Sequence, residues 1–98
     1  MNRYEDFHQS LSNQSPPSQL SPLLAALWHD KKGDWHTAHE LAQDVNTTDG
    51  SWIHAYLHRK EGDNGNASYW YHRAGRTMPT HSLDTEWENI VRELLKRS

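Results

Sequence analysis

The sequence predicts an all-α fold: five helices packed as an antiparallel stack of hairpins, preceded by a flexible N-terminal arm. Three features support this prediction. Apolar residues recur at helical spacing along most of the chain, no segment reads as a β-strand, and a Gly-Asp pair occurs twice, 29 residues apart. We therefore divide the chain into an arm, residues 1–21, and a single helical domain, residues 22–98.

The composition indicates one small domain with an aromatic core. The chain has 98 residues, of which 34% are hydrophobic, and only 15 are Leu, Ile, Val or Phe. Five Trp and four Tyr supply the missing burial, because each aromatic side chain can remove about 150–250 Å² from water. Cysteine is absent, which excludes a disulfide framework and a thiolate site.

Charge and hydropathy narrow the expected partners and location. The formal net charge is −3 and the pI is about 6.2, whereas nucleic-acid binding normally shows a basic bias. The first twenty residues are polar and no apolar run approaches membrane-spanning length. We therefore expect a cytoplasmic protein with neither a nucleic-acid partner nor a membrane partner.

The arm, residues 1–21, is rich in Asn, Gln, Ser and Pro. Its "SPPS" run at residues 15–18 cannot continue a helix. Two hypotheses remain for the part before this run. It is either a frayed terminus, or one or two helical turns that fold back across the Pro-containing run and fill the inner groove of the stack with their apolar side. The residues with the required helical spacing are Tyr4, Phe7, His8 and Leu11.

The first two predicted helices meet at Gly33 and Asp34. Ser21 is suited to cap the first helix, and Pro22 fits its first position because an N–H there would have no intrahelical partner. The run at residues 23–28 is apolar nearly all round, so this helix should be covered on more than one side. Gly33 can end it in the left-handed conformation, and Asp34 can cap the next helix. The stripe of that helix is Trp35, Ala38, Leu41, Ala42 and Val45.

Two further helices follow a turn cluster at residues 46–50. The third helix is predicted at about residues 51–61 and the fourth at about residues 64–74. The Gly-Asp pair at residues 62–63 joins them in the same way as the first pair, and Gly75 ends the fourth helix.

The last predicted helix begins at Ser82 or Asp84 and has one clean apolar stripe. A helix that is polar on its far side is what the end of a stack requires. The stripe is Trp87, Ile90, Val91, Leu94 and Leu95, and the opposite polar side is Glu86, Glu88, Arg92, Glu93 and Lys96.

The two Gly-Asp pairs belong to a longer internal repeat. Residues 26–38 and residues 55–67 match at six of thirteen positions. Gly ends one helix, Asp starts the next, and Ala on either side lets the helices approach closely. A period of this size predicts stacked helical hairpins. The matches are Ala26/Ala55, His29/His58, Lys31/Lys60, Gly33/Gly62, Asp34/Asp63 and Ala38/Ala67.

The segments "GDWHTAHELAQDV" and "GDNGNASYWYHRAG" resemble the turn and second helix of tetratricopeptide repeats, and "ASYWYHRAG" is closer to the related Sel-like repeats. The resemblance covers about residues 22–75 and implies a tetratricopeptide-like mini-solenoid. The chain departs from the pattern in its shorter period, in having two repeats, and in Ala42, where an aromatic residue is expected. Residues 24–79 also resemble a family of short uncharacterised bacterial proteins, which implies no function.

The repeat register predicts a binding surface on the inner side of the stack. First-helix side chains at i, i+4 and i+7 should face this groove, and Trp, Tyr and Arg tend to dominate binding energy. We therefore expect a protein or peptide interaction module with an unknown partner. The alternative is that the same side chains form the core. The predicted partner-binding residues are Leu27, Asp30, Trp52, Tyr56 and Arg59.

Eight histidines suggest a second function, a metal-binding protein or hydrolase. His54 and His58 stand at i, i+4, a spacing that occurs in zinc sites, and a third ligand would come from residues 36–40. The simpler interpretation is structural, because His29 and His58 occupy equivalent repeat positions where each ring can pack between helices. On that interpretation the chain holds no metal.

No catalytic motif stands out. The chain has no Cys and no Ser in an elbow motif, and Asp30, Glu40 and Glu61 are expected to be ordinary surface carboxylates. We therefore expect no enzyme activity and no cofactor. A third possibility is a structural homodimer that pairs through the open end of the stack.

Overall fold

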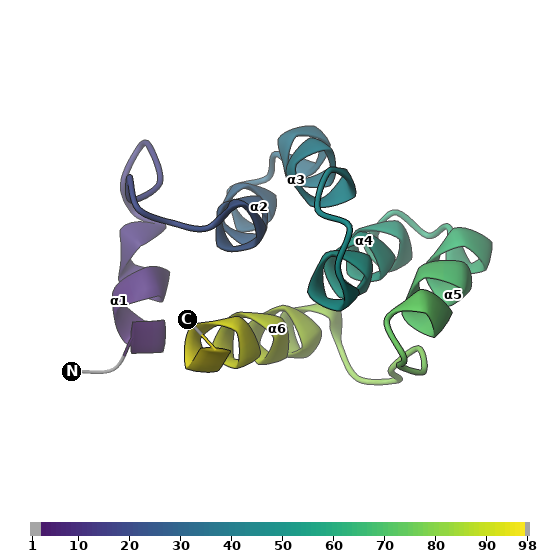
Figure 1. Cartoon of the computed structure of the whole chain (residues 1–98). Coiled ribbons are helices and arrows are strands. Elements are labelled where there is room, and N and C mark those ends of the chain that lie inside the picture. Colours follow the sequence, from purple (N-terminus) through teal and green to yellow (C-terminus); the bar gives the residue numbers. More distant parts are fainter. Residues whose placement is uncertain (1–2, 98) are drawn as a thin grey trace.

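The computed structural model describes residues 3–97 and is all-α in this range, as the sequence predicts (Figure 1). It has six helices there, one more than the five expected, because part of the N-terminal arm is helical. The helices are α1 (Arg3–Ser10), α2 (Pro22–Lys31), α3 (Trp35–Gln43), α4 (Thr48–Lys60), α5 (Asn64–Arg73) and α6 (Leu83–Arg97).

The two Gly-Asp corners have nearly the same backbone geometry. Gly33 and Gly62 adopt φ of +91° and +87°, the left-handed region in which Gly avoids a Cβ clash. The N–H of Asp34 and that of Asp63 each donate to the carbonyl five residues earlier at 2.9 Å. Each aspartate side chain accepts from the N–H three residues later, at 3.1 and 3.3 Å. One dipeptide therefore ends one helix and begins the next, as predicted.

α4 begins three residues earlier than the sequence indicated. Thr47 caps it by accepting the N–H of Gly50 at 3.0 Å, so residues 48–50 belong to the helix and not to a turn. Gly50 is required for a different reason from the corner glycines. A Cβ at this position would overlap the carbonyl group of Val45. The close approach of two backbone segments explains the glycine.

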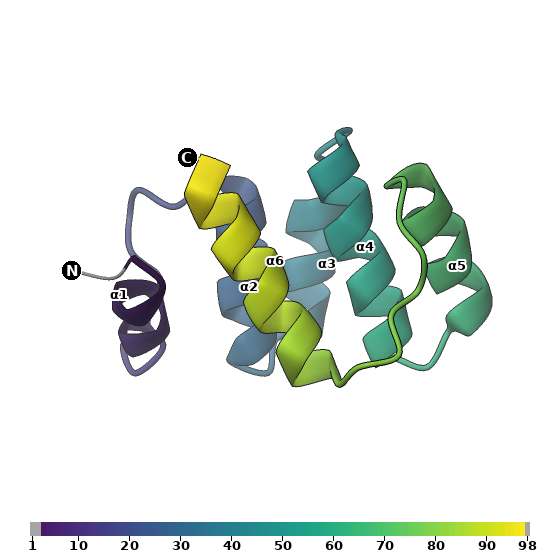
Figure 2. The ribbon, with the colours of Figure 1, turned by 90° about the horizontal axis from the view of Figure 1, so that it is seen from below.

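The helices form two hairpins with a sixth helix laid across them. α2 pairs with α3, α4 pairs with α5, and α3 packs on α4, so the four helices make a continuous row (Figures 1 and 2). α6 crosses α2 and α4. α1 lies at the α2 end of the row (Figure 1), where Phe7 contacts Trp87 of α6 and Ser10 accepts from Trp28 of α2. The expectation that the last helix closes the end of the stack is therefore wrong. Its apolar stripe covers both hairpins, and α5 packs mainly on α4, with Tyr71 of α5 also reaching Glu86 of α6.

The core is aromatic, and its indoles have hydrogen-bond partners. Trp28 and Trp87 are buried, and they donate to the Ser10 hydroxyl at 3.2 Å and to the Leu27 carbonyl at 2.9 Å. A buried indole N–H without an acceptor would cost free energy. Within residues 3–97, every buried side-chain nitrogen or oxygen has a hydrogen-bond partner.

Part of the N-terminal arm forms the helix α1. This helix folds back over the domain, in agreement with that part of the second hypothesis for the arm. Phe7 is buried and its ring lies 6.0 Å from that of Trp87, centroid to centroid. The Arg3 guanidinium donates to the Leu95 carbonyl at 2.8 Å. The helix covers α6, and it does not enter a groove between α2 and α4, so the expectation that it fills the inner groove is wrong.

Candidate functional site

The predicted groove residues lie where α6 crosses the two hairpins. Four of the five are buried, and Arg59 is partly exposed. Their position agrees with the alternative that they belong to the core, because α6 of the same chain occupies the expected groove (Figure 2). The four buried residues are Leu27, Asp30, Trp52 and Tyr56.

Asp30 is a buried carboxylate, so the expectation of an ordinary surface acid is wrong. It is 1% exposed, accepts the Tyr56 hydroxyl at 2.9 Å and forms an ion pair with the Lys60 ammonium at 2.8 Å. Burial, followed by the negative charge of Asp30, raises the pKa of Tyr56 well above 10. Both partners come from α4, so this network fixes α2 against α4.

Glu86 is the centre of a second buried network, although the sequence placed it on the polar side of the last helix. It is 2% exposed. Its carboxylate accepts from the Arg59 guanidinium at 2.8 Å, from the Tyr71 hydroxyl at 2.6 and 2.7 Å, and from the Trp52 indole at 3.3 Å. Burial and the bond to Glu86 raise the pKa of Tyr71 well above 10.

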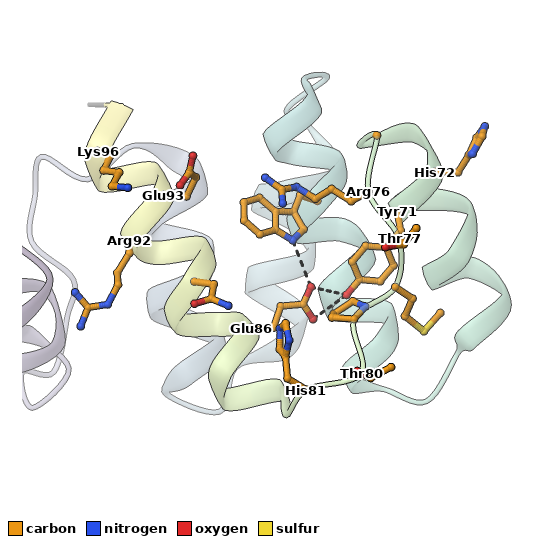
Figure 3. A pocket seen from close by; sticks show the side chains of 15 residues that line it. Tyr71, His72, Arg76, Thr77, Thr80, His81, Glu86, Arg92, Glu93 and Lys96 are labelled. Atoms are coloured by element: carbon orange, nitrogen blue, oxygen red, sulfur yellow. Dashed lines mark hydrogen bonds between the residues drawn. The ribbon is translucent and has the colours of Figure 1, made fainter.

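An open pocket lies above the Glu86 network, between α4, α6 and the connection that joins α5 to α6 (Figure 3). Its volume is about 1280 Å³. Trp52 is the one predicted partner-binding residue that lines it. Its lining includes Trp52, Arg76, Glu86, Asn89, Glu93 and Lys96.

The pocket carries two cations that no carboxylate neutralises. The Arg76 guanidinium lies 3.4 Å from the centroid of the Trp52 ring, in a cation–π contact. Neither Arg76 nor Lys96 forms an ion pair within the described part of the chain. The other charges of the wall are balanced, since Arg92 pairs with Glu88 and Glu93 pairs with Arg97. The rim is therefore positive in a protein of net negative charge.

The histidines separate into different environments. His39, His54 and His58 come together on one side of α3 and α4. Burial, followed by the neighbouring imidazoles, lowers the pKa of His54 to about 4. Burial is also the main cause that lowers the pKa of His39. His36 pairs with Glu40 on the exposed surface.

The structural role predicted for two histidines corresponds to two different contacts. The His29 ring lies edge-on to the Trp28 ring, with centroids 5.2 Å apart. The His58 Nδ1 lies 2.6 Å from a carboxylate oxygen of Glu61. The equivalent repeat positions therefore place both rings against aromatic neighbours, and only His58 also has a carboxylate partner among the described residues.

Sequence reasoning missed the residues that shape the open pocket and the third histidine of the cluster. Arg76 follows Gly75, and helical periodicity gives no sign of its contact with Trp52. Periodicity places Glu86 and Lys96 on the polar side of the last helix; Lys96 is exposed, as predicted, but Glu86 is buried. His39 was one of several candidates for a third ligand, and only the packing of α3 on α4 selects it.

Comparisons with protein-family models, with curated proteins and with solved structures gave no match to this chain. Among residues 3–97, none of the helices combines the length and the apolar character that crossing a membrane requires. The proposals below therefore depend on the geometry of the chain itself.

Proposed function

We propose that the protein is a tetratricopeptide-like interaction module that binds an acidic peptide segment in the open pocket between α4, α6 and the α5–α6 connection. The resemblance of residues 22–75 to tetratricopeptide repeats favours a binding function over catalysis. The observation that carries the proposal is the pair of unneutralised cations, Arg76 and Lys96, on the pocket wall.

The cations supply the attraction for carboxylate side chains. Arg76 is held over Trp52, so its guanidinium loses little freedom when it pairs with a carboxylate. Lys96 projects from α6 on another wall of the same pocket (Figure 3). A ligand that reaches both must carry two acidic groups or an acidic side chain near a C-terminal carboxylate.

The connection between α5 and α6 supplies hydrogen bonds for a peptide backbone. Residues 77–80 have no regular secondary structure, and their backbone groups make no hydrogen bond within the described range. Their carbonyl groups, and the N–H groups of all but Pro79, can pair with an extended ligand. The segment is anchored beyond this point, since Arg59 donates to the carbonyl of His81.

The test uses a synthetic peptide array of acidic, neutral and basic sequences, followed by fluorescence anisotropy with the best acidic peptide. We expect binding that weakens with salt and that is lost when the Glu side chains of the peptide are changed to Gln. The double variant R76A/K96A should lower the affinity at least about tenfold. The control is R73A, compared with the single variants R76A and K96A, because each of the three removes one positive charge and Arg73 lies on the exposed surface of α5 outside the pocket.

Two results would overturn this proposal. One is equal binding of the peptide by the wild type and by R76A/K96A. The other is concentration-dependent self-association, measured by sedimentation, that R76A/K96A abolishes. In that case the pocket would hold a second copy of the chain.

A further inference from the structure

A cluster of three imidazoles lies on the side of α4 that faces α3. His39 projects from α3, and His54 and His58 project from successive turns of α4. One ring nitrogen from each histidine lies within 4.8 Å of one ring nitrogen from both others. The Nε2 atoms of His39 and His54 are 3.0 Å apart. The cluster shares no residue with the open pocket, so it is independent of the proposed peptide binding.

Two tryptophans fix the orientation of the cluster. The ring of Trp35 stacks on that of His39 with a centroid separation of 4.9 Å and an interplanar angle of 15°. The ring of Trp70 stacks on that of His54 at 4.0 Å and 23°. Trp35 is itself anchored, because its indole donates to the Leu57 carbonyl at 2.9 Å. Packing therefore restricts the rotation of two of the imidazoles.

The third imidazole has a carboxylate partner of the kind that orients metal ligands. The Nδ1 of His58 lies 2.6 Å from Glu61 Oε1. When Nδ1 carries the proton and donates it to Glu61, the lone pair of His58 is on Nε2. A carboxylate behind a histidine ligand fixes the tautomer and raises the basicity of the ring.

We propose that His39, His54 and His58 bind one divalent transition-metal ion, with zinc as the best match. Imidazole nitrogens suit zinc and its neighbours in the first transition row, whereas magnesium and calcium prefer oxygen ligands. Three protein ligands leave a fourth position open for water or another small ligand, an arrangement typical of accessible zinc sites.

The distances require only a small adjustment. At a Zn–N bond of about 2.0–2.1 Å, tetrahedral ligands have nitrogens roughly 3.3–3.4 Å apart. The 3.0 Å between the Nε2 atoms of His39 and His54 is close to this value. The remaining separations, each below 4.8 Å, both involve His58 and must shorten by at most about 1.5 Å, which rotation of the partly exposed His58 side chain can provide.

A neighbouring group is a weaker candidate for the same ion. His58, Glu61 and Asp63 also have donor atoms within 4.8 Å of one another. Both oxygens of Asp63 are engaged in capping α5, where they accept from the backbone and the side chain of Asn66. Glu61 is engaged with His58. The two groups differ in His39, which only the first contains, so a variant at His39 separates them.

The first experiment measures zinc binding by the full-length chain, purified without a His tag and stripped with EDTA. Isothermal titration with zinc chloride should give one ion per chain. Cobalt(II) should give the strong visible absorption of a tetrahedral site, and zinc should displace it. A thermal scan should show a higher Tm with zinc, because the ion links α3 to α4 and binds only the folded chain.

The variants locate the ligands. His39→Ala should lower zinc affinity at least about 100-fold, because it removes one of three ligands, and it does so at a partly exposed position. Glu61→Gln should lower it by about 10–100-fold, the usual effect of losing the carboxylate behind a ligand. The control is His36→Ala, which removes an exposed histidine from the same helix. Circular dichroism without metal checks that each variant folds.

Three results would overturn the site. One is the absence of stoichiometric zinc binding by the wild-type chain. Another is equal zinc affinity of the wild type and His39→Ala, which would leave the histidines as packing groups or move the ion to His58, Glu61 and Asp63. If His39→Ala does not fold, His58→Gln replaces it. Unchanged affinity in that variant excludes both groups.

Discussion

The hairpins α2–α3 and α4–α5 share one corner but present different chemistry around it. Their corner glycines differ by only 4° in φ, +91° against +87°. Positions 29 residues apart nevertheless carry opposite charges, Asp30 in the first hairpin and Arg59 in the second. Asp30 binds Tyr56 and Lys60 from the second hairpin, and Arg59 binds Glu86 from α6. The repeated positions set the backbone, and the positions that differ connect the hairpins to their neighbours.

The same division applies to the histidine cluster. His58 has its repeat counterpart in His29, but His39 corresponds to Ser68 in the second hairpin. Only one hairpin interface, that of α3 with α4, therefore brings three imidazoles together. An internal repeat of this kind supplies the scaffold, and single substitutions within it produce the candidate site.

The largest loss of stability is expected when the network that joins the second hairpin to α6 is removed. Glu86→Ala leaves Arg59, Tyr71 and Trp52 without their shared acceptor, and the free energy of unfolding should fall by about 3–5 kcal/mol. Urea denaturation followed by circular dichroism measures the change. Glu88→Ala is the control on the same helix. It removes an exposed ion pair with Arg92, so its cost should stay within about 1 kcal/mol. Equal costs would contradict the role of Glu86.

A smaller loss of stability is expected when the network that joins the first hairpin to the second is removed. Asp30→Ala leaves the buried Tyr56 hydroxyl without its acceptor, at a cost of about 1–3 kcal/mol. The loss is smaller than for Glu86 because the Lys60 side chain is 36% exposed and can return to water, whereas that of Arg59 is 15% exposed. Urea denaturation under the same conditions gives the ranking. A larger loss for Asp30→Ala than for Glu86→Ala would reverse it.

The two corners should respond alike to the same substitution. Gly33→Ala and Gly62→Ala each force a Cβ into the left-handed region and should each cost about 1–2 kcal/mol. Neither position has a steric obstacle, since a Cβ would meet no heavy atom within 4 Å. Gly65→Ala, inside α5 and equally open, should instead stabilise the chain by about 0.5–1 kcal/mol. Thermal denaturation of the three variants measures the difference, and unequal corner costs would disprove their equivalence.

The last expected effect is absent near neutral pH. It concerns the stability of the folded chain in alkaline solution. The pKa of Tyr56 and that of Tyr71 are raised in the folded chain, and the unfolded value is about 10. The unfolded chain therefore loses protons that the folded chain retains, so the contribution of these two tyrosines to stability is constant below pH 10 and falls as the pH rises above it. Tyr71→Phe should make this fall shallower, whereas Tyr69→Phe, at an exposed position, should leave it unchanged. Urea midpoints across this range test the prediction.

The helix corners could be predicted because their cause is local. Gly33 and Gly62 are followed at once by a capping Asp, and the whole device fits within a few residues. The predicted start of α4 was three residues too late because Gly50 resembles a turn residue. Its actual requirement is the nearby backbone of Val45, which no local pattern reveals.

The candidate sites depended on contacts between distant parts of the chain. The spacing of His54 and His58 indicated a shared face, but His39 joins them only through the packing of α3 on α4. Glu86 looked solvent-facing because helical periodicity describes one helix at a time. Its partner Tyr71 lies fifteen residues earlier and becomes a neighbour only when α6 crosses α4.

The contact between α1 and α6 brings the first and the last described helices together. The guanidinium of Arg3 reaches the carbonyl of Leu95, so the first and last described helices begin and finish side by side (Figure 1). The start of α1 and the end of α6 are therefore neighbours, and a flexible linker could join these two helix ends and close the chain into a ring. Opening such a ring at the solvent-exposed Gly33 corner would give a circularly permuted protein with every helix in its present place.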